Sequence, residues 1–174
     1  MPDPYITLLN KGLVYNATFN YKESQVSGLL VLKRTGVSSY HVVMLSKPGP
    51  TLMEFTLDQD GLTWIKTFER LEEKKLTKLI ENDFRMLLLD VLENPSKVKK
   101  VKTENDKTIF KMADGTRLKV DNTANRVLTA QNKSFLNFIS TKATFSYREN
   151  EIPQTIFLAH NIMNLSLELE LLPK

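Results

Sequence analysis

The sequence contains no cysteine, which excludes disulfide bonds, thiolate metal sites and cysteine nucleophiles. Its two histidines, His41 and His160, have no carboxylate or serine at motif spacing, and we expect both to be surface or strand histidines. Glycine is scarce, and neither a phosphate-binding glycine loop nor a zinc-type spacing is present. We therefore predict no catalytic residues, no metal site and no cofactor, and we expect that the protein is not an enzyme.

Long apolar runs are absent as well, because no stretch reaches the roughly 18 apolar residues that a membrane-spanning helix requires. The first ten residues lack the basic flank and apolar core of a signal peptide, but a chain trimmed of its leader would look the same. Of the 174 residues, 41% are hydrophobic and 25% are charged, which is ordinary for a globular protein. We predict a single domain over residues 1–174.

The net charge is small, at +4, and four lysines gather around one short expected strand. A solvated face is our main interpretation of these lysines, and contact with nucleic acid or an anionic lipid surface is the lesser one. Of these two partners we retain the membrane surface and expect no nucleic acid. The four residues are Lys97, Lys99, Lys100 and Lys102.

The segment from Lys74 to Glu93 has the pattern of a long helix with one wide apolar face. Pro95 cannot continue a helix and disfavours helical angles in the residue before it, so we expect the helix to end near Glu93. Most charged side chains of the segment fall on the opposite side. The apolar residues recur at spacings of three and four and are Leu76, Leu79, Ile80, Phe84, Leu87, Leu88, Val91 and Leu92.

Nearly all of the remaining chain has the pattern of β-strands, with the clearest alternation in residues 13–21 and 164–172. Asp114-Gly115 fits a two-residue hairpin turn, and Gly28 indicates a bulge or a sharp bend within a strand. About ten or eleven strands joined by short turns favour antiparallel neighbours. We therefore predict a mainly β fold with α (α+β), in which a curled antiparallel sheet or unclosed β-barrel packs around one long helix.

Large apolar side chains from the strands and the helix would converge on the concave side of such a sheet. They form either a well-packed core or a cavity that holds an acyl chain, and the sequence alone does not separate the two. Methionine suits a cavity because its flexible side chain adapts to a variable guest. The candidate cavity residues are Tyr15, Phe19, Met44, Met53, Phe55, Trp64, Leu79, Phe84, Leu88, Phe110 and Met112.

Three stretches carry a family resemblance. Residues 26–31, VSGLLV, form an early strand with a central glycine, and residues 45–52, LSKPGPTL, form a leucine-serine-proline-glycine turn. Residues 143–172 give a strand, a turn with Pro153 and two amphipathic strands. Together with the order of elements, which is about six strands, one helix and then more strands, these features resemble the periplasmic lipoprotein carriers LolA and LolB.

The resemblance implies an unclosed antiparallel barrel with helices as its lid and a hydrophobic cavity for the acyl chains of a lipid or lipoprotein. The LolB type has an exposed apolar loop that helps to deliver cargo to a membrane. The matching loop here, our candidate membrane or partner loop, lacks a protruding leucine and comprises Lys47, Pro48, Gly49 and Pro50.

The resulting hypothesis is a non-enzymatic lipid- or lipoprotein-binding protein of the bacterial cell envelope. Its location would be periplasmic, or anchored to the outer membrane, if a leader was trimmed. Two alternatives stay open: a structural or adaptor domain whose core is filled by its own side chains, and an enzyme of the same half-barrel superfamily. The sequence indicates no oligomeric state and no particular cargo.

Overall fold

The computed structural model describes residue 5 and residues 11–47, 49–67, 74–133, 140–149, 151–162 and 164–173. Residues that are alternately apolar and polar form strands, with the apolar side chains buried on one face. In the last strand, for example, Leu165, Leu167 and Leu169 are buried, whereas Glu168 is exposed. Within these ranges there are twelve strands instead of the expected ten or eleven. Their bounds are β1 Leu13–Tyr21, β2 Ser24–Gly36, β3 Ser39–Ser46, β4 Thr51–Leu57, β5 Leu62–Lys66, β6 Val98–Glu104, β7 Lys107–Met112, β8 Arg117–Asp121, β9 Arg126–Lys133, β10 Ser140–Ser146, β11 Thr155–His160 and β12 Leu165–Leu171.

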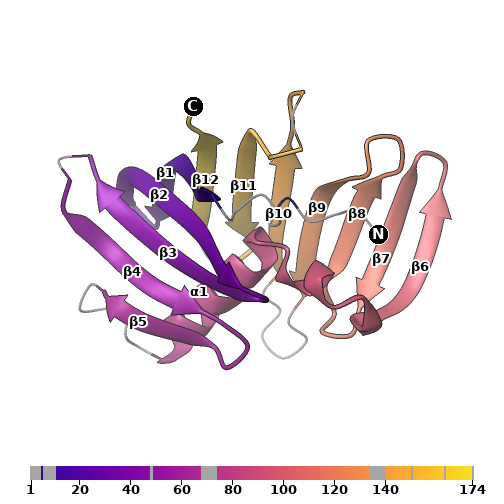
Figure 1. Ribbon diagram of the computed structural model, residues 1–174, viewed down its shortest axis with the longest axis horizontal. Coiled ribbons are helices and arrows are strands. Elements are labelled where there is room, and N and C mark those ends of the chain that lie inside the picture. The colour runs from indigo at the N-terminus through magenta and orange to yellow at the C-terminus, as the bar shows by residue number, and fades with distance from the viewer. Residues whose placement is uncertain are drawn as a thin grey trace.

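All twelve strands belong to one sheet, in the order β5-β4-β3-β2-β1-β12-β11-β10-β9-β8-β7-β6. Every neighbouring pair is antiparallel, and β1 with β12 is the pair that joins distant parts of the chain. The sheet curls into two wings, β1–β5 and β6–β11, on either side of β12 (Figure 1). Within the described residues no pairing joins β5 to β6. The prediction of a curled, unclosed antiparallel sheet is therefore confirmed.

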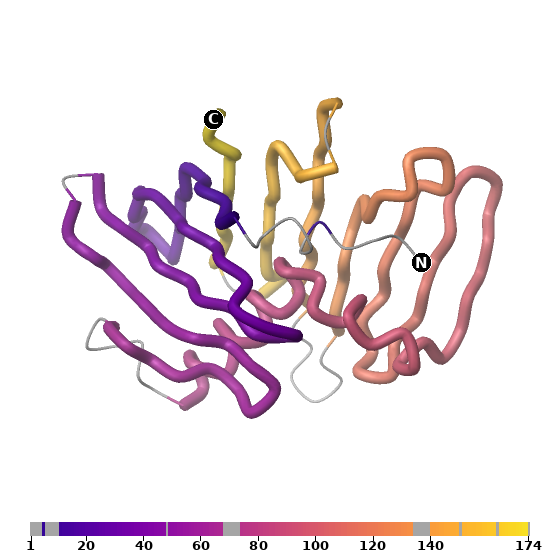
Figure 2. Tube along the Cα trace, viewed as in Figure 1, coloured from indigo at the N-terminus to yellow at the C-terminus, as the bar shows by residue number. Residues whose placement is uncertain are grey.

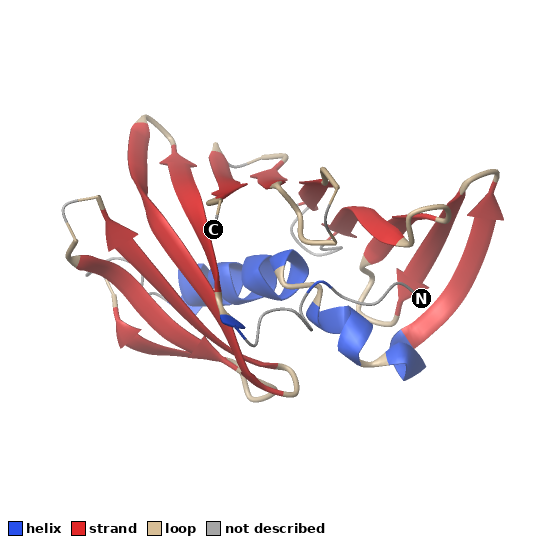
Figure 3. Cartoon of the chain, turned by 45° about the horizontal axis from the view of Figure 1, so that its top comes forward, coloured by secondary structure: helices blue, strands red, loops and turns tan. Residues whose placement is uncertain are grey.

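The helix α1, Lys74–Leu87, lies in the hollow between the two wings (Figure 3). The Cα trace in Figure 2 shows that the chain crosses from one wing to the other through α1 and the short segment after it. The inner side of α1 packs on the concave side of the sheet, so the apolar stripe of the helix and the apolar faces of the strands form one core.

The prediction that this helix continues to Glu93 was wrong. The α-helix ends at Leu87 because Leu89 adopts a left-handed conformation, with φ at 56°. Two short 3₁₀ helices follow, η2 at Asp90–Glu93 and η3 at Pro95–Lys97. Leu88, Leu89 and Leu92 are nevertheless buried, because the turned backbone still directs their side chains into the core.

Two glycine predictions also need correction. Asp114-Gly115 does lie in a hairpin, but four residues, 113–116, separate β7 from β8, and the amide of Met112 donates to the Thr116 carbonyl at 2.8 Å to close the loop. The amide of Gly115 donates to the carbonyl of Met112 at 3.2 Å, and only the glycine takes positive φ, at 89°. Gly28 causes no register shift in its strand. Instead, a Cβ there would come within 2.0 Å of the Leu45 carbonyl oxygen, so close backbone approach explains the glycine.

Candidate functional site

An apolar cavity of about 140 Å³ lies between α1 and the concave side of the sheet. Eleven of its thirteen lining residues are apolar, and the exceptions are Asp83 and Ser166. The helix contributes Leu76, Ile80, Asp83 and Phe84. The sheet contributes Phe19, Val26, Leu30, Met44 and Met53 from β1–β4, Leu158 from β11, and Leu165, Ser166 and Leu167 from β12.

The size of this cavity limits what it can hold with the helix in its present place. It is close to the roughly 150 Å³ at which a dry apolar cavity accepts benzene, and smaller than the roughly 300 Å³ of most ligand pockets. A short hydrocarbon segment therefore fits, whereas a whole acyl chain requires α1 to move away from the sheet.

Aromatic side chains fasten α1 to β4 and β5 beside the cavity. The ring of Phe55 meets Phe84 of the helix edge-on at 5.0 Å between centroids, and meets Trp64 edge-on at 5.3 Å. The indole Nε1 of Trp64 donates to Thr77 Oγ1 at 3.1 Å. These contacts resist outward movement of the helix on the side of β5.

A buried polar cluster fastens the same helix to the other wing. Nε2 of His160 on β11 lies 2.9 Å from Oδ2 of Asp83, and Nδ1 lies 3.0 Å from the hydroxyl of Thr141 on β10. With Asp83 ionised and the imidazole neutral, this arrangement requires Nε2–H to donate to the carboxylate and the Thr141 hydroxyl to donate to Nδ1. The cluster ties α1 to β10 and β11.

The carboxyl group of Asp83 is electrostatically unfavourable at this position. Its Oδ1 is buried and has no hydrogen-bond partner among the described residues. Burial raises the pKa of Asp83 above its usual range, and the hydrogen bond and charge of His160 offset only part of that shift. Asp83 is thus the one acid among the residues that line the cavity, whose lining is otherwise apolar except for Ser166.

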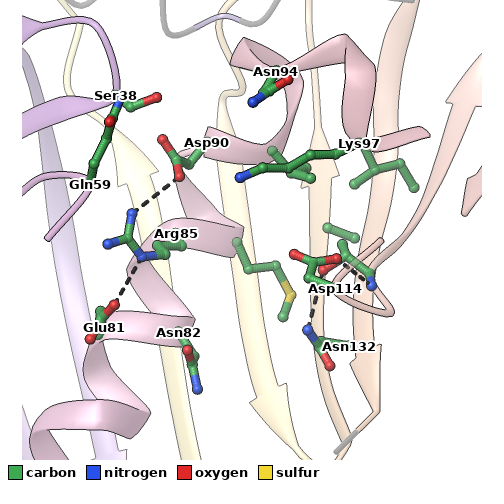
Figure 4. A pocket seen from close by; sticks show the side chains of 15 residues that line it. Ser38, Gln59, Glu81, Asn82, Arg85, Asp90, Asn94, Lys97, Asp114 and Asn132 are labelled. Atoms are coloured by element: carbon green, nitrogen blue, oxygen red, sulfur yellow. Dashed lines mark hydrogen bonds and ion pairs between the residues drawn. The ribbon is translucent and has the colours of Figure 1, made fainter. Parts of the chain in front are cut away.

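A second, polar cavity of about 450 Å³ lies between the C-terminal half of α1, η2 and the turn from β7 to β8 (Figure 4). Arg85 organises one side of it: Nε contacts Glu81 Oε1 at 3.0 Å, Nη1 contacts Asp90 Oδ2 at 3.2 Å, and Nη2 donates to the Asp58 carbonyl at 2.5 Å. On the other side Asn132 Nδ2 donates to Thr116 Oγ1 at 3.2 Å. These polar walls do not suit a hydrocarbon chain.

The structure brings four of the eleven candidate cavity residues to the apolar cavity: Phe19, Met44, Met53 and Phe84. The other seven do not line it. Tyr15, Phe55, Leu88 and Met112 are buried elsewhere, and the Tyr15 hydroxyl donates to the Pro153 carbonyl. The partly exposed ones are Trp64, Leu79 and Phe110.

The candidate membrane or partner loop connects β3 to β4. Its described residues Lys47, Gly49 and Pro50 are exposed, and Pro48 lies outside the described residues. The amide of Gly49 donates to the Ser46 carbonyl at 2.9 Å, and Gly49 has φ at 113°, so this glycine permits the tight turn.

Sequence reasoning missed the polar part of the site. Asp83 follows Ile80 by three positions and precedes Leu87 by four, so an acid on the apolar face of the helix was a signal that we overlooked. Both histidines lie in strands, as expected, but each has a carboxylate partner that the sequence spacing did not indicate, because His41 Nε2 also lies 2.8 Å from Glu54 Oε1. Strand pairing and helix packing create both contacts, and sequence spacing cannot show them.

Within the described ranges, no group of three or more histidine, aspartate or glutamate side chains is placed to hold a metal ion. In that same part of the chain, no helix combines the length and the apolar character needed to cross a bilayer.

The fold and the cavity together define a class: an unclosed antiparallel barrel whose concave side holds a helix and an apolar space. Comparison with solved structures places the chain within a known fold. A LolA superfamily protein from Nitrosomonas europaea is similar at a TM-score of 0.58 and 10% identity, over 98% of this chain and 92% of that one. A putative outer membrane lipoprotein-sorting protein domain from Vibrio parahaemolyticus is similar at a TM-score of 0.50 and 12% identity, over 97% and 89%.

The chain therefore has a LolA-like fold, as the sequence resemblance implied. No protein-family model matches the sequence, and a comparison with curated proteins finds no relative. The likeness is thus one of structure, and the function has to be argued from the site.

Proposed function

We propose that this protein is a non-enzymatic carrier that binds acyl chains of a lipid or lipoprotein between its curled sheet and α1. The observation that carries the proposal is the apolar cavity, where Met44, Met53 and Phe84 converge from three elements. Burial of each methylene group contributes about 0.8 kcal/mol, so a few methylenes give measurable affinity. The LolA-like fold supports the same function.

Binding of a long chain would require α1 to separate from the sheet. Part of the apolar packing of the helix would then be replaced by contacts with the ligand, and three specific contacts would break: the Trp64–Thr77 hydrogen bond, the ring contact of Phe84 and the Asp83–His160 pair. The enlarged space would keep its apolar lining, because the same side chains would then face the ligand.

The buried polar cluster does not favour an enzyme, although a hydroxyl, an imidazole and a carboxylate are linked by hydrogen bonds, as in some catalytic sites. The His160 side chain has no exposed surface, and Thr141 is buried and does not line either cavity. A nucleophile must reach its substrate, so we assign this cluster a positioning role for α1.

From the proposed cargo we infer that the protein is periplasmic or anchored to the outer membrane. We also infer that the loop at residues 47–50 contacts a membrane or a partner protein.

Binding of a fluorescent fatty acid tests the proposal. In Met53→Trp the larger indole would occupy part of the cavity that Met53 lines, and loss of only two buried methylenes of the ligand would weaken binding about 15-fold. Ile65→Trp adds the same side chain at an exposed position of β5 and should bind like the wild type. A second variant, Phe84→Glu, places a charge in the cavity and should abolish binding, provided that circular dichroism shows an intact sheet.

Native mass spectrometry of the purified protein provides an independent measurement, in which co-purified acyl species would support a carrier. If the wild type binds no acyl ligand, or if Met53→Trp binds as tightly as Ile65→Trp, the cavity is not the binding site. Absence of any acyl affinity would favour the adaptor alternative.

A further inference from the structure

The outer face of the wing β6–β10 carries a row of basic residues that the strand register places side by side. Lys100 on β6 pairs with Lys111 on β7, and Lys111 pairs with Arg117 on β8. The row continues through Gln131 on β9 to Lys142 on β10. These side chains lie on the side opposite to the buried Met112, Leu118 and Ala143 and therefore point away from the helix.

Four further basic residues share this outer face by the same alternation: Lys102, Lys107, Lys119 and Lys133. The acidic residues of the face in these five strands are Glu104 and Asp121. Lys102 forms an ion pair with Glu104. The register also places Arg126 on β9 opposite Asp121. Nine basic residues thus share this face with two acidic ones, whereas the sequence predicted a basic cluster only around β6.

Like charges directly opposite each other destabilise a sheet. Lys100, Lys111 and Arg117 are adjacent in three successive strands, and none has an ion pair or hydrogen bond to another side chain in the described part of the protein. The fold alone gives no reason for this arrangement. An external anionic partner does, because it would neutralise the row.

The basic face also ends abruptly. On β12 two of the three outer positions are occupied by the exposed Glu168 and Glu170, and the third by Ser166. The convex side of the sheet is therefore positive over one wing and negative at its centre, which would orient the molecule on a charged surface.

We propose that the outer face of β6–β10 binds the anionic headgroups of a phospholipid surface. Broad charge spread over several strands matches a layer of many headgroups, and each lysine or arginine close to such a layer contributes about 1 kcal/mol. Single-stranded nucleic acid fits less well, because the described outer positions of these five strands include no aromatic side chain on which bases could stack. The inference goes beyond the proposed function, since adsorption does not require an occupied acyl cavity.

Vesicle co-sedimentation tests the inference. The full chain should bind vesicles of equal parts phosphatidylglycerol and phosphatidylcholine, should not bind pure phosphatidylcholine, and should be released by high salt. Each basic residue is worth about a fivefold change in partitioning, so the triple variant Lys111→Gln, Arg117→Gln, Lys119→Gln should bind about 100-fold more weakly. It should remain folded, because removal of adjacent like charges relieves repulsion.

The matched control neutralises three exposed lysines outside this face, Lys11, Lys33 and Lys66, and has the same net charge as the first variant. It should retain most of the vesicle binding. Equal losses in the two triple variants, or binding that ignores lipid charge, would overturn the inference. Tighter binding to single-stranded DNA than to the anionic vesicles would also overturn it. Fatty-acid binding by the first triple variant should be unchanged, so failure of this inference is separable from failure of the carrier function.

Discussion

Replacement of His160 by leucine should destabilise the protein strongly and in a pH-dependent manner. The imidazole is fully buried and is the hydrogen-bond partner of Asp83, whose second carboxylate oxygen already has none. Removal of the partner of a buried charge typically costs about 3–5 kcal/mol, because the charge, here the carboxylate of Asp83, is left without compensation. The hydroxyl of Thr141 would lose its partner as well, at about 1 kcal/mol or more.

A loss of this size is a large part of the roughly 5–15 kcal/mol that stabilises an ordinary domain. Urea unfolding, followed by circular dichroism and by the fluorescence of Trp64, would measure it. Near pH 7 the loss should be full, whereas at lower pH protonation of Asp83 removes the uncompensated charge and the loss should shrink. The double variant with Asp83→Leu and His160→Leu should recover most of the stability.

Three results would refute this reasoning: a loss below about 1 kcal/mol, a loss that is independent of pH, or a double variant less stable than His160→Leu. Any of them would mean that the Asp83–His160 contact does not hold α1 on the sheet. Another interaction would then have to keep α1 closed over the cavity.

Two further predictions concern single positions. Burial raises the pKa of Asp83 above its usual value of about 3.9. The stability of the wild type relative to Asp83→Asn should therefore be greatest below about pH 4 and should fall as the pH rises through the raised pKa. Urea titrations at several pH values measure this difference in stability, and a difference that does not change with pH would contradict the prediction. Gly28→Ala should cost about 1–3 kcal/mol or more in thermal melts, because its Cβ would meet the Leu45 carbonyl oxygen at 2.0 Å. Gly36→Ala, whose Cβ would have an ordinary 3.5 Å contact with Ser39, should be nearly neutral.

The sequence predicted the strands and the curled sheet well where alternation was strong. β12 is the clearest case, because its leucines and glutamates leave one register in which Leu165, Leu167 and Leu169 are buried. The end of α1 was predicted poorly. Pro95 was an evident stop signal, but the left-handed turn at Leu89 carries no glycine or asparagine to mark it, and it leaves Leu88, Leu89 and Leu92 buried, as the apolar pattern of the segment indicated.

The candidate site was predictable in character but not in position. Aromatic and methionine residues indicated an apolar concave side, yet only some of them line the cavity, and residues such as Leu76 and Leu165 complete it. The Asp83–His160 contact spans 77 positions, and the basic outer face depends on the register of five strands. Such features follow from tertiary pairing, so local patterns contain little information about them.

The pairing of β1 with β12 has a consequence for how the protein is made. β1 and β12, the first and the last strands along the chain, pair at the centre of the sheet. Hydrogen bonds of the sheet therefore cannot join the two halves of the molecule until β12 has been synthesised. Before that moment β1 and β11 would both present free hydrogen-bonding edges, which invite pairing with other chains. A ribosome-bound chain that lacks β12 would therefore be the species most in need of chaperone protection, and ribosome profiling of chaperone contacts should show engagement until this strand emerges.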